Sequence, residues 1–199
     1  MKIIFFHSFI ILIPAKLLVA TGSGQGEFAR SSEVIDLENP DSKCDPLEEF
    51  PLGTMGGYGA LLDDKYPLVC GGYVRNKGST SQCAILGGDQ ELSSIEERES
   101  PSSILIDSST LWVTGGLHYE DGNPMGIKSA TSEYISLNKD ISGPGPDLPV
   151  HVWSHCMVRT EGGALLIGGV SNEYFSSKKS FWFDNASAEW REVYQSKNL

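Results

Sequence analysis

A Gly-Gly pair returns three times in this chain, each time directly after a short apolar segment. The three copies end the segments 68–72, 112–116 and 166–169. A period of roughly 40 to 50 residues marks a repeat protein, in which each unit shares its apolar core with a neighbour because it cannot bury that face alone. In such proteins function lies in the loops, so the pattern constrains the architecture more than the activity.

The same order of segments surrounds each pair. A strand of small residues comes first, then a polar turn such as Asp63-Asp64, then the strand that ends in Gly-Gly, then a loop and a third strand. Apolar and β-branched runs favour strands, and the acidic and glycine-rich breaks favour turns. We therefore expect four-stranded antiparallel units. Their first strands are predicted at 59–62, 103–106 and 156–159, and their third strands at 32–37, 81–86, 132–137 and 180–184.

These glycine pairs, together with a segment that runs from Phe183 through six residues to Trp190, resemble the kelch family. The resemblance covers about residues 32–194 and implies an all-β fold, a kelch-type β-propeller of about three and a half four-stranded antiparallel blades. The predicted boundaries are a half blade at 32–50 and blades at 54–94, 101–149 and 152–194. At the Trp190 position the other copies carry Cys44, Ser93 and Pro144, so their fourth strands are weakly marked.

Three and a half blades do not close a ring, since nothing supplies the inner strands of the first blade. An open arc leaves apolar faces and strand edges exposed. Three arrangements therefore remain open: a homodimer that completes a propeller, a fragment or shortened gene product, and an unusual small assembly.

The first residues predict export. Lys2 is followed by the apolar runs 3–6 and 9–13, and small residues at 20–22 offer a cleavage point. This pattern is typical of a signal peptide, here 1–22, with a short flexible linker over 23–31. The alternative is an uncleaved anchor helix, but His7, Pro14 and Lys16 interrupt a stretch already short for a bilayer. We expect a secreted, extracellular protein without a membrane span after cleavage.

Charge and cysteine content narrow the partners and the compartment. The formal net charge of −11 repels nucleic acid and favours a basic partner. Four cysteines in an oxidising compartment allow three pairings. Antiparallel pairing of the strands around Cys70 and Cys83 would bring these two side by side, which predicts a disulfide between them. The pairing of Cys44 and Cys156 stays open.

The resemblance also implies a ligand face, formed by the loops between second and third strands and by the links between blades. Aromatic residues beside charges suit an interaction surface, whereas the alternative is a set of ordinary solvated loops. The residues predicted there are Arg75, Asn76, Lys77, His118, Tyr119, Glu120, Asp121, Asn172, Glu173 and Tyr174, with Glu96, Glu97, Arg98, His151 and Trp153 from the links. Asn185, which begins the sequon Asn185-Ala186-Ser187 in a turn, is a predicted glycosylation site.

Metal binding and catalysis have little support. His151, His155 and Cys156 lie close in sequence, but residues four apart in a strand are about 13 Å apart, and Cys156 aligns with Gly59 and Ser103 as a small packed residue. Neither a nucleophile elbow nor a phosphate loop occurs. We therefore expect a non-enzymatic module, without cofactor or metal, that binds an extracellular protein. The alternative is a secreted propeller enzyme or carbohydrate-binding protein, which requires a pocket that gathers His118, His151 or Tyr174 with carboxylates.

Overall fold

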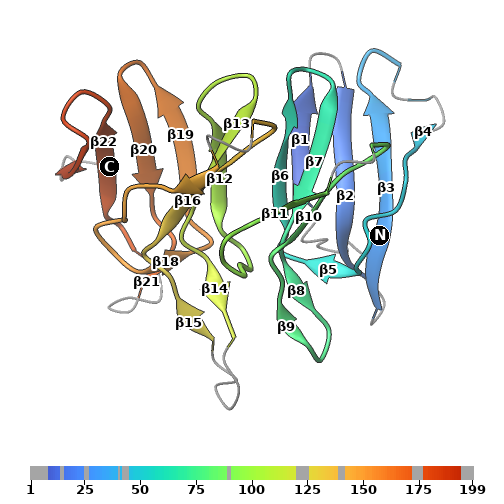
Figure 1. Ribbon diagram of the computed structural model, residues 1–199, viewed down its shortest axis with the longest axis horizontal. Coiled ribbons are helices and arrows are strands. Elements are labelled where there is room, and N and C mark those ends of the chain that lie inside the picture. Colours follow the sequence, from blue (N-terminus) through green and yellow to red (C-terminus); the bar gives the residue numbers. More distant parts are fainter. Residues whose placement is uncertain are drawn as a thin grey trace. The chain divides into compact units, whose positions relative to one another are not determined.

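The structure is a computed structural model, and its described part is all-β, without helices. The described residues are 9–13, 16–24, 27–39, 41, 45–88, 91–119, 126–138, 142–171 and 177–193. The chain divides into two compact units, residues 1–99 and 100–199. Each unit holds two four-stranded antiparallel sheets, and smaller sheets lie at the lower end of these in Figure 1.

In unit 1 the first sheet contains β1 (Phe9–Ile13), β2 (Lys16–Gly24), β3 (Glu27–Asp36) and β4 (Asp45–Pro46), paired in that order. The second sheet contains β6 (Tyr58–Leu62), β7 (Tyr66–Cys70), β10 (Gln82–Ile85) and β11 (Glu91–Ser93). A three-stranded sheet joins β5 (Thr54–Met55), β8 (Tyr73–Val74) and β9 (Gly78–Ser79).

Unit 2 follows the same plan. The third sheet contains β12 (Ser102–Leu105), β13 (Thr110–Thr114), β16 (Ser132–Ser136) and β17 (Gly143–Pro144). The fourth contains β19 (Cys156–Thr160), β20 (Gly163–Ile167), β22 (Ser180–Asp184) and β23 (Glu189–Val193). Two small sheets pair β14 (Leu117–His118) with β15 (Ile127–Lys128), and β18 (Val152–Trp153) with β21 (Val170–Ser171).

The first sheet corrects the expected half blade and linker. β2 pairs with β3 along its length, from Lys16 opposite Asp36 to Gly24 opposite Glu27, and β1 pairs with the other edge of β2. The segment 23–31 is therefore part of two paired strands rather than a flexible linker. The apolar run before it matches both a leader and a buried strand, and the sequence interpretation chose the leader. Cleavage of residues 1–22 stays a prediction, to which we return below.

The register of the sheets also corrects the position of Cys156. Cys156 pairs with Ile167, as Tyr58 pairs with Cys70 and Ser102 with Thr114, and each of these partners directly precedes a Gly-Gly pair. Cys156 thus corresponds to Tyr58 and Ser102, one residue away from the sequence alignment. A shift of one residue places a side chain on the other face of a sheet. Cys156 therefore shares a face of the fourth sheet with the exposed Ile167. It is exposed there and forms no disulfide, although its counterpart Tyr58 is buried.

Each unit has its own core between its two main sheets. In unit 1 the fully buried Ala20, Phe50 and Val69 pack with Leu86. In unit 2 the core is larger and rich in aromatic rings. Its buried members are Trp112, Leu148, Val152, Met157, Ala164, Leu166, Phe181 and Phe183.

Cys70 and Cys83 form a disulfide, which is the pairing that the sequence predicts. They are direct register partners on β7 and β10, with Cα atoms 4.0 Å apart. Both residues are buried. A disulfide suits an oxidising, extracellular setting. Within the described residues, no helix has the length and apolar character that crossing a bilayer requires.

Replacing both cysteines by serine is expected to lower the free energy of unfolding by about 2 to 4 kcal/mol, because the cross-link restricts the unfolded chain and the serine hydroxyls are buried. Chemical denaturation followed by tryptophan fluorescence measures this change. Cys156→Ser, at an exposed and unbonded position, is the control and should leave stability unchanged. Equal melting temperatures with and without reductant would contradict the prediction.

Candidate functional site

All three Gly-Gly pairs have the left-handed backbone that glycine tolerates best. The first glycines, Gly71, Gly115 and Gly168, have φ values of 61°, 60° and 67°. Each donates its N–H to a carbonyl at the start of the third strand of its sheet, at 2.9 to 3.1 Å. The pair therefore ends the second strand and turns the chain into the loop beyond the sheet.

The second glycine fastens that loop to the link that follows the sheet. Gly72 donates its N–H to the Arg98 carbonyl at 2.8 Å, and Gly116 donates to the Val152 carbonyl at 2.9 Å. A Cβ on Gly72 would lie 2.9 Å from the Met55 carbonyl oxygen. Glycine is required here because backbone approaches backbone at this point.

In unit 2 these contacts build a platform from three chain segments. We call the paired strands β14 and β15, the link 150–153 and β21 the loop platform (Figure 1). The Lys128 Nζ donates to the Ser171 carbonyl at 3.0 Å, and the His151 Nδ1–H donates to the Lys128 carbonyl at 2.9 Å. The Val152 N–H donates to the Ser129 carbonyl at 3.1 Å. The three segments are thereby held in one arrangement before any partner binds.

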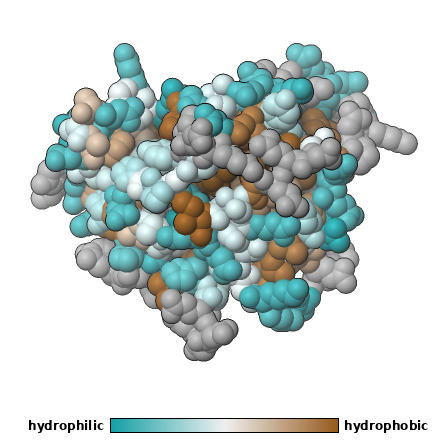
Figure 2. All heavy atoms as spheres, in the orientation of Figure 1, coloured by the Kyte–Doolittle hydropathy of each residue, from teal (hydrophilic) through white to brown (hydrophobic). Residues whose placement is uncertain are grey.

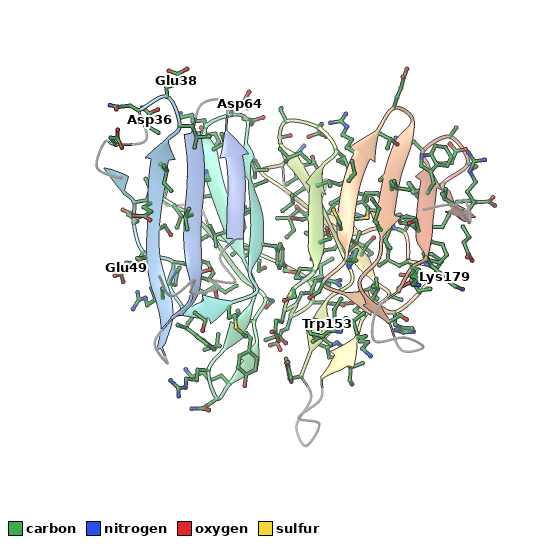
Figure 3. The ribbon with its side chains drawn as sticks, turned by 180° about the vertical axis from the view of Figure 1, so that it is seen from behind. Asp36, Glu38, Glu49, Asp64, Trp153 and Lys179 are labelled. Atoms are coloured by element: carbon green, nitrogen blue, oxygen red, sulfur yellow. A yellow bond between two sulfur atoms is a disulfide. The ribbon has the colours of Figure 1, made fainter. Side chains whose placement is uncertain are left out.

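Trp153 is the large aromatic residue of this platform. It lies on β18, opposite Val170 of β21, at the lower end of unit 2 (Figure 3). The side chain is half-buried, and its buried indole Nε1–H has no hydrogen-bond acceptor among the described residues. An unpaired buried donor costs free energy.

His155 follows the link 150–153 in the chain and is enclosed by glycines of two sheets. Its Cε1 lies 2.9 Å from the position of a Cβ on Gly115, and its Cβ lies 2.7 Å from that of one on Gly169. Its Nε2 lies 2.9 Å from the Thr114 Oγ1, which itself donates to the Ser102 carbonyl. The hydroxyl proton is used there, so Nε2–H is the donor to Thr114. Burial lowers the pKa of His155 to about 4.

This pKa predicts acid destabilisation. The folded pKa of about 4 lies below the usual 6.5, so the neutral imidazole stabilises the fold fully above pH 6.5. That contribution, about 3 kcal/mol, is lost as the pH falls from about 6.5 to about 4. Denaturation curves measured across this range should show the loss. His155→Asn should flatten the curve there, whereas exposed His151→Asn should not; identical profiles for both variants would contradict the assignment.

In unit 1 the corresponding loop is the β8–β9 hairpin. Arg75, Asn76 and Lys77 form its exposed tip, where Asn76 has a φ of 61° and the Lys77 N–H donates to the Val74 carbonyl. Tyr73, at the base, packs edge to face on Phe28 with ring centroids 6.1 Å apart. The hairpin thus presents two cationic side chains on a short, anchored turn.

The opposite end of unit 1 is acidic. Asp64 lies in the β6–β7 turn, Asp36 ends β3 and Glu38 follows it (Figure 3). Asp63 and Asp64 have φ values of 49° and 53°, the conformation of a tight hairpin turn. Unit 1 therefore separates a cationic hairpin from an acidic end, within a chain of net charge −11. The visible surface is largely hydrophilic, with separate hydrophobic groups (Figure 2).

The other predicted face residues have mixed outcomes. His118 ends β14 and Tyr119 follows it, both half-buried. Glu120, Asp121, Asn172, Glu173 and Tyr174 lie outside the described residues. Lys128 and Ser171 of the platform were missed by the sequence interpretation, because the contact between them joins loops 43 residues apart.

The expectation that Arg98 is exposed in its link is wrong. Arg98 is only 1% exposed and forms an ion pair with Glu96 at 3.0 Å. Its carbonyl also accepts the Gly72 N–H. The side chain of Arg98 is therefore buried although it belongs to a charged stretch of the sequence. Arg98 helps to hold the loops in place and is not part of their surface.

Two further features lie away from the loops. A hollow of about 410 Å³ in unit 1 is lined by the segment 48–51 and by β10 and β11. Asn185 lies exposed in the β22–β23 turn, where its backbone N–H donates to the Gly162 carbonyl. Within the described ranges, no three metal-ligating side chains from His, Cys, Asp and Glu gather in one place.

Comparisons with known proteins address the fold alone. No family model matches the chain, and no curated protein matches it by sequence. Among solved structures, one described as "Structure of YjhT" is similar with a TM-score of 0.76 and 13% sequence identity. The match covers 98% of this chain and 67% of the other. The chain is thus an all-β protein of repeated antiparallel sheets. Its fold is shared with the YjhT structure at a sequence identity too low to carry function.

Proposed function

We propose that this chain is a secreted segment of a kelch-type propeller, with each four-stranded sheet as one blade, that binds an extracellular protein without catalysis or cofactor. The repeated Gly-Gly geometry and the repeated four-stranded antiparallel sheets support the propeller. The Cys70–Cys83 disulfide supports the oxidising compartment.

The loop platform is the observation that carries the binding function. Three segments distant in sequence are tied together by backbone carbonyls, so a partner meets a surface that is already ordered. Preorganisation reduces the entropy cost of association. Trp153 adds a rigid, half-buried ring. Tryptophan is enriched among residues that dominate binding energy because it supplies large area with few rotatable bonds.

The test uses the purified secreted protein against a panel of extracellular ectodomains, with affinities measured by surface plasmon resonance. Trp153→Ala is expected to weaken a specific interaction at least about tenfold, which is the effect of a residue central to an interface. Lys77→Glu tests the β8–β9 tip. Its control is Lys65→Glu, the same charge change at the acidic end of the same unit. A specific interaction that is unchanged by Trp153→Ala and Lys77→Glu would overturn the proposal.

A carbohydrate ligand is the rival class, since an aromatic ring such as that of Trp153 also suits a sugar. A glycan array run with the same variants separates the two. Saturable binding of one glycan that Trp153→Ala abolishes would replace protein binding. Turnover of that glycan would further indicate the propeller enzyme.

The exposed outer face of the fourth sheet supports a homodimer as the arrangement of the chain. Val158, Ile167 and Val193 are 43%, 38% and 41% exposed on that face. The corresponding face of the third sheet, with Ile104 and Trp112, is covered by the fourth sheet itself. A second copy of the chain would cover the exposed face in the same way. Light scattering should then give twice the monomer mass, and a soluble monomer would contradict it.

A further inference from the structure

The N-terminal apolar stretch contains a fourth copy of the repeat motif. In β2, Ala20 is followed by Thr21 and Gly22, with φ values of 54° and 135°. In β7, Cys70 is followed by Gly71 and Gly72, with φ values of 61° and 97°. The β2–β3 register shifts between Ala20 and Gly22, the position where the other pairs leave their strands. Residues 18–22 therefore perform the structural role of residues 68–72.

The same residues are part of the core of unit 1. Ala20 is fully buried against Phe50, Val69 and Leu86, and Thr21 is 5% exposed. Thr21 Oγ1 also lies 3.7 Å from the position of a Cβ on Gly57, at the start of the second sheet. Cleavage at 20–22 would remove the strand that supplies Ala20 and would leave β3 without its neighbour on that side.

The residues before β2 suffice for a leader. Lys2 supplies the positive charge, and the apolar runs 3–6 and 9–13 lie within a stretch of the 7–15 residues that a signal peptide uses. Ala15 is the small residue directly before β2. The apolar stretch thus divides into a leader-like part, whose β1 is the edge strand of the first sheet, and β2, which pairs on both of its edges.

We propose that the leader ends before Lys16, so that the mature protein begins with β2. This inference rests on the proposed secretion. The mature first sheet then retains β2, β3 and β4. The edge of β2 that β1 occupies in the full chain becomes free.

The experiment expresses the full chain with a C-terminal tag in secreting animal cells and determines the N-terminus of the protein in the medium by intact mass and Edman sequencing. An N-terminus at Lys16 supports the proposal. An N-terminus from Thr21 to Ser23 overturns it while leaving secretion intact. Retention of Met1, or absence from the medium, contradicts both the inference and the proposed secretion.

Two substitutions in the full chain give a second measurement. Thr21→Gly removes the side chain at a left-handed position and should raise the melting temperature of the secreted protein by a few degrees if β2 is retained. Ala20→Asp should abolish accumulation of folded protein, because it places a carboxylate in the core. If cleavage follows Gly22, the mature Thr21→Gly and wild-type proteins are identical and melt together, which would overturn the proposal.

Discussion

Replacing Trp112 by alanine should lower the free energy of unfolding by about 3 to 5 kcal/mol, the range for large buried aromatic residues. Trp112 is 2% exposed, and its ring centroid lies 5.1 Å from that of Phe183 and 5.8 Å from that of Trp190. Its Nε1–H donates to the Ser132 Oγ at 2.9 Å, a bond that alanine also removes. Trp112 of the third sheet thus packs directly on Phe183 and Trp190 of the fourth sheet.

Trp182→Ala is the matched control. Trp182 lies on the other face of the fourth sheet, half-buried, with the Arg191 guanidinium 4.2 Å from its ring centroid. Because Trp182 stays partly exposed in the folded protein, its folding removes less apolar area from water than that of Trp112. The expected loss of unfolding free energy is therefore about 1 kcal/mol. Urea denaturation followed by far-ultraviolet circular dichroism measures both variants. Equal losses of unfolding free energy in the two variants would contradict the central position of Trp112 in the core of unit 2.

Gly115→Ala should cost about 3 kcal/mol or more, because two penalties add. The backbone φ of 60° is unfavourable for any residue with a Cβ. The added methyl group would also collide with the Val152 carbonyl oxygen and lie 2.9 Å from the His155 Cε1. Neither neighbour has room to move, since Val152 accepts the Gly116 N–H and His155 is enclosed.

Gly162→Ala separates the two penalties. Gly162 has a φ of 81°, but a Cβ there would meet nothing within 4 Å. Only the conformational cost remains, about 1 to 2 kcal/mol. Thermal unfolding of the two variants therefore measures the steric part as a difference. Similar melting temperatures would show that the platform accommodates a methyl group beside Val152.

The sequence predicted the repeated strands well because their signals are local. Gly-Gly after an apolar run fixed β7, β13 and β20, and the segment to Trp190 fixed the five-residue β23. The fourth strands β4, β11 and β17 have only two or three residues each, which explains why their signal is weak. The prediction for the first sheet was wrong because an apolar run followed by small residues is typical both of a signal peptide and of an inner strand of this repeat.

The candidate site was predicted less completely, for a physical reason. Exposed tips such as Arg75 and Lys77 follow from turn chemistry alone. The burial of Arg98 and the exposure of Cys156 depend on strand register and on backbone partners that are distant in sequence. A single-residue error in alignment reversed the face of Cys156, and no local pattern signals the bond from Lys128 to Ser171.

The hydrogen bonds of the second glycines determine which positions of the sequence are restricted where a loop meets a link. Gly72 and Gly116 connect loop and link through backbone N–H and carbonyl groups. At Gly72 this joint requires a residue without a Cβ rather than a particular side chain. A joint made through backbone groups restricts the neighbouring side chains less than one made through side-chain contacts. The YjhT structure has a similar fold at a TM-score of 0.76 with 13% sequence identity.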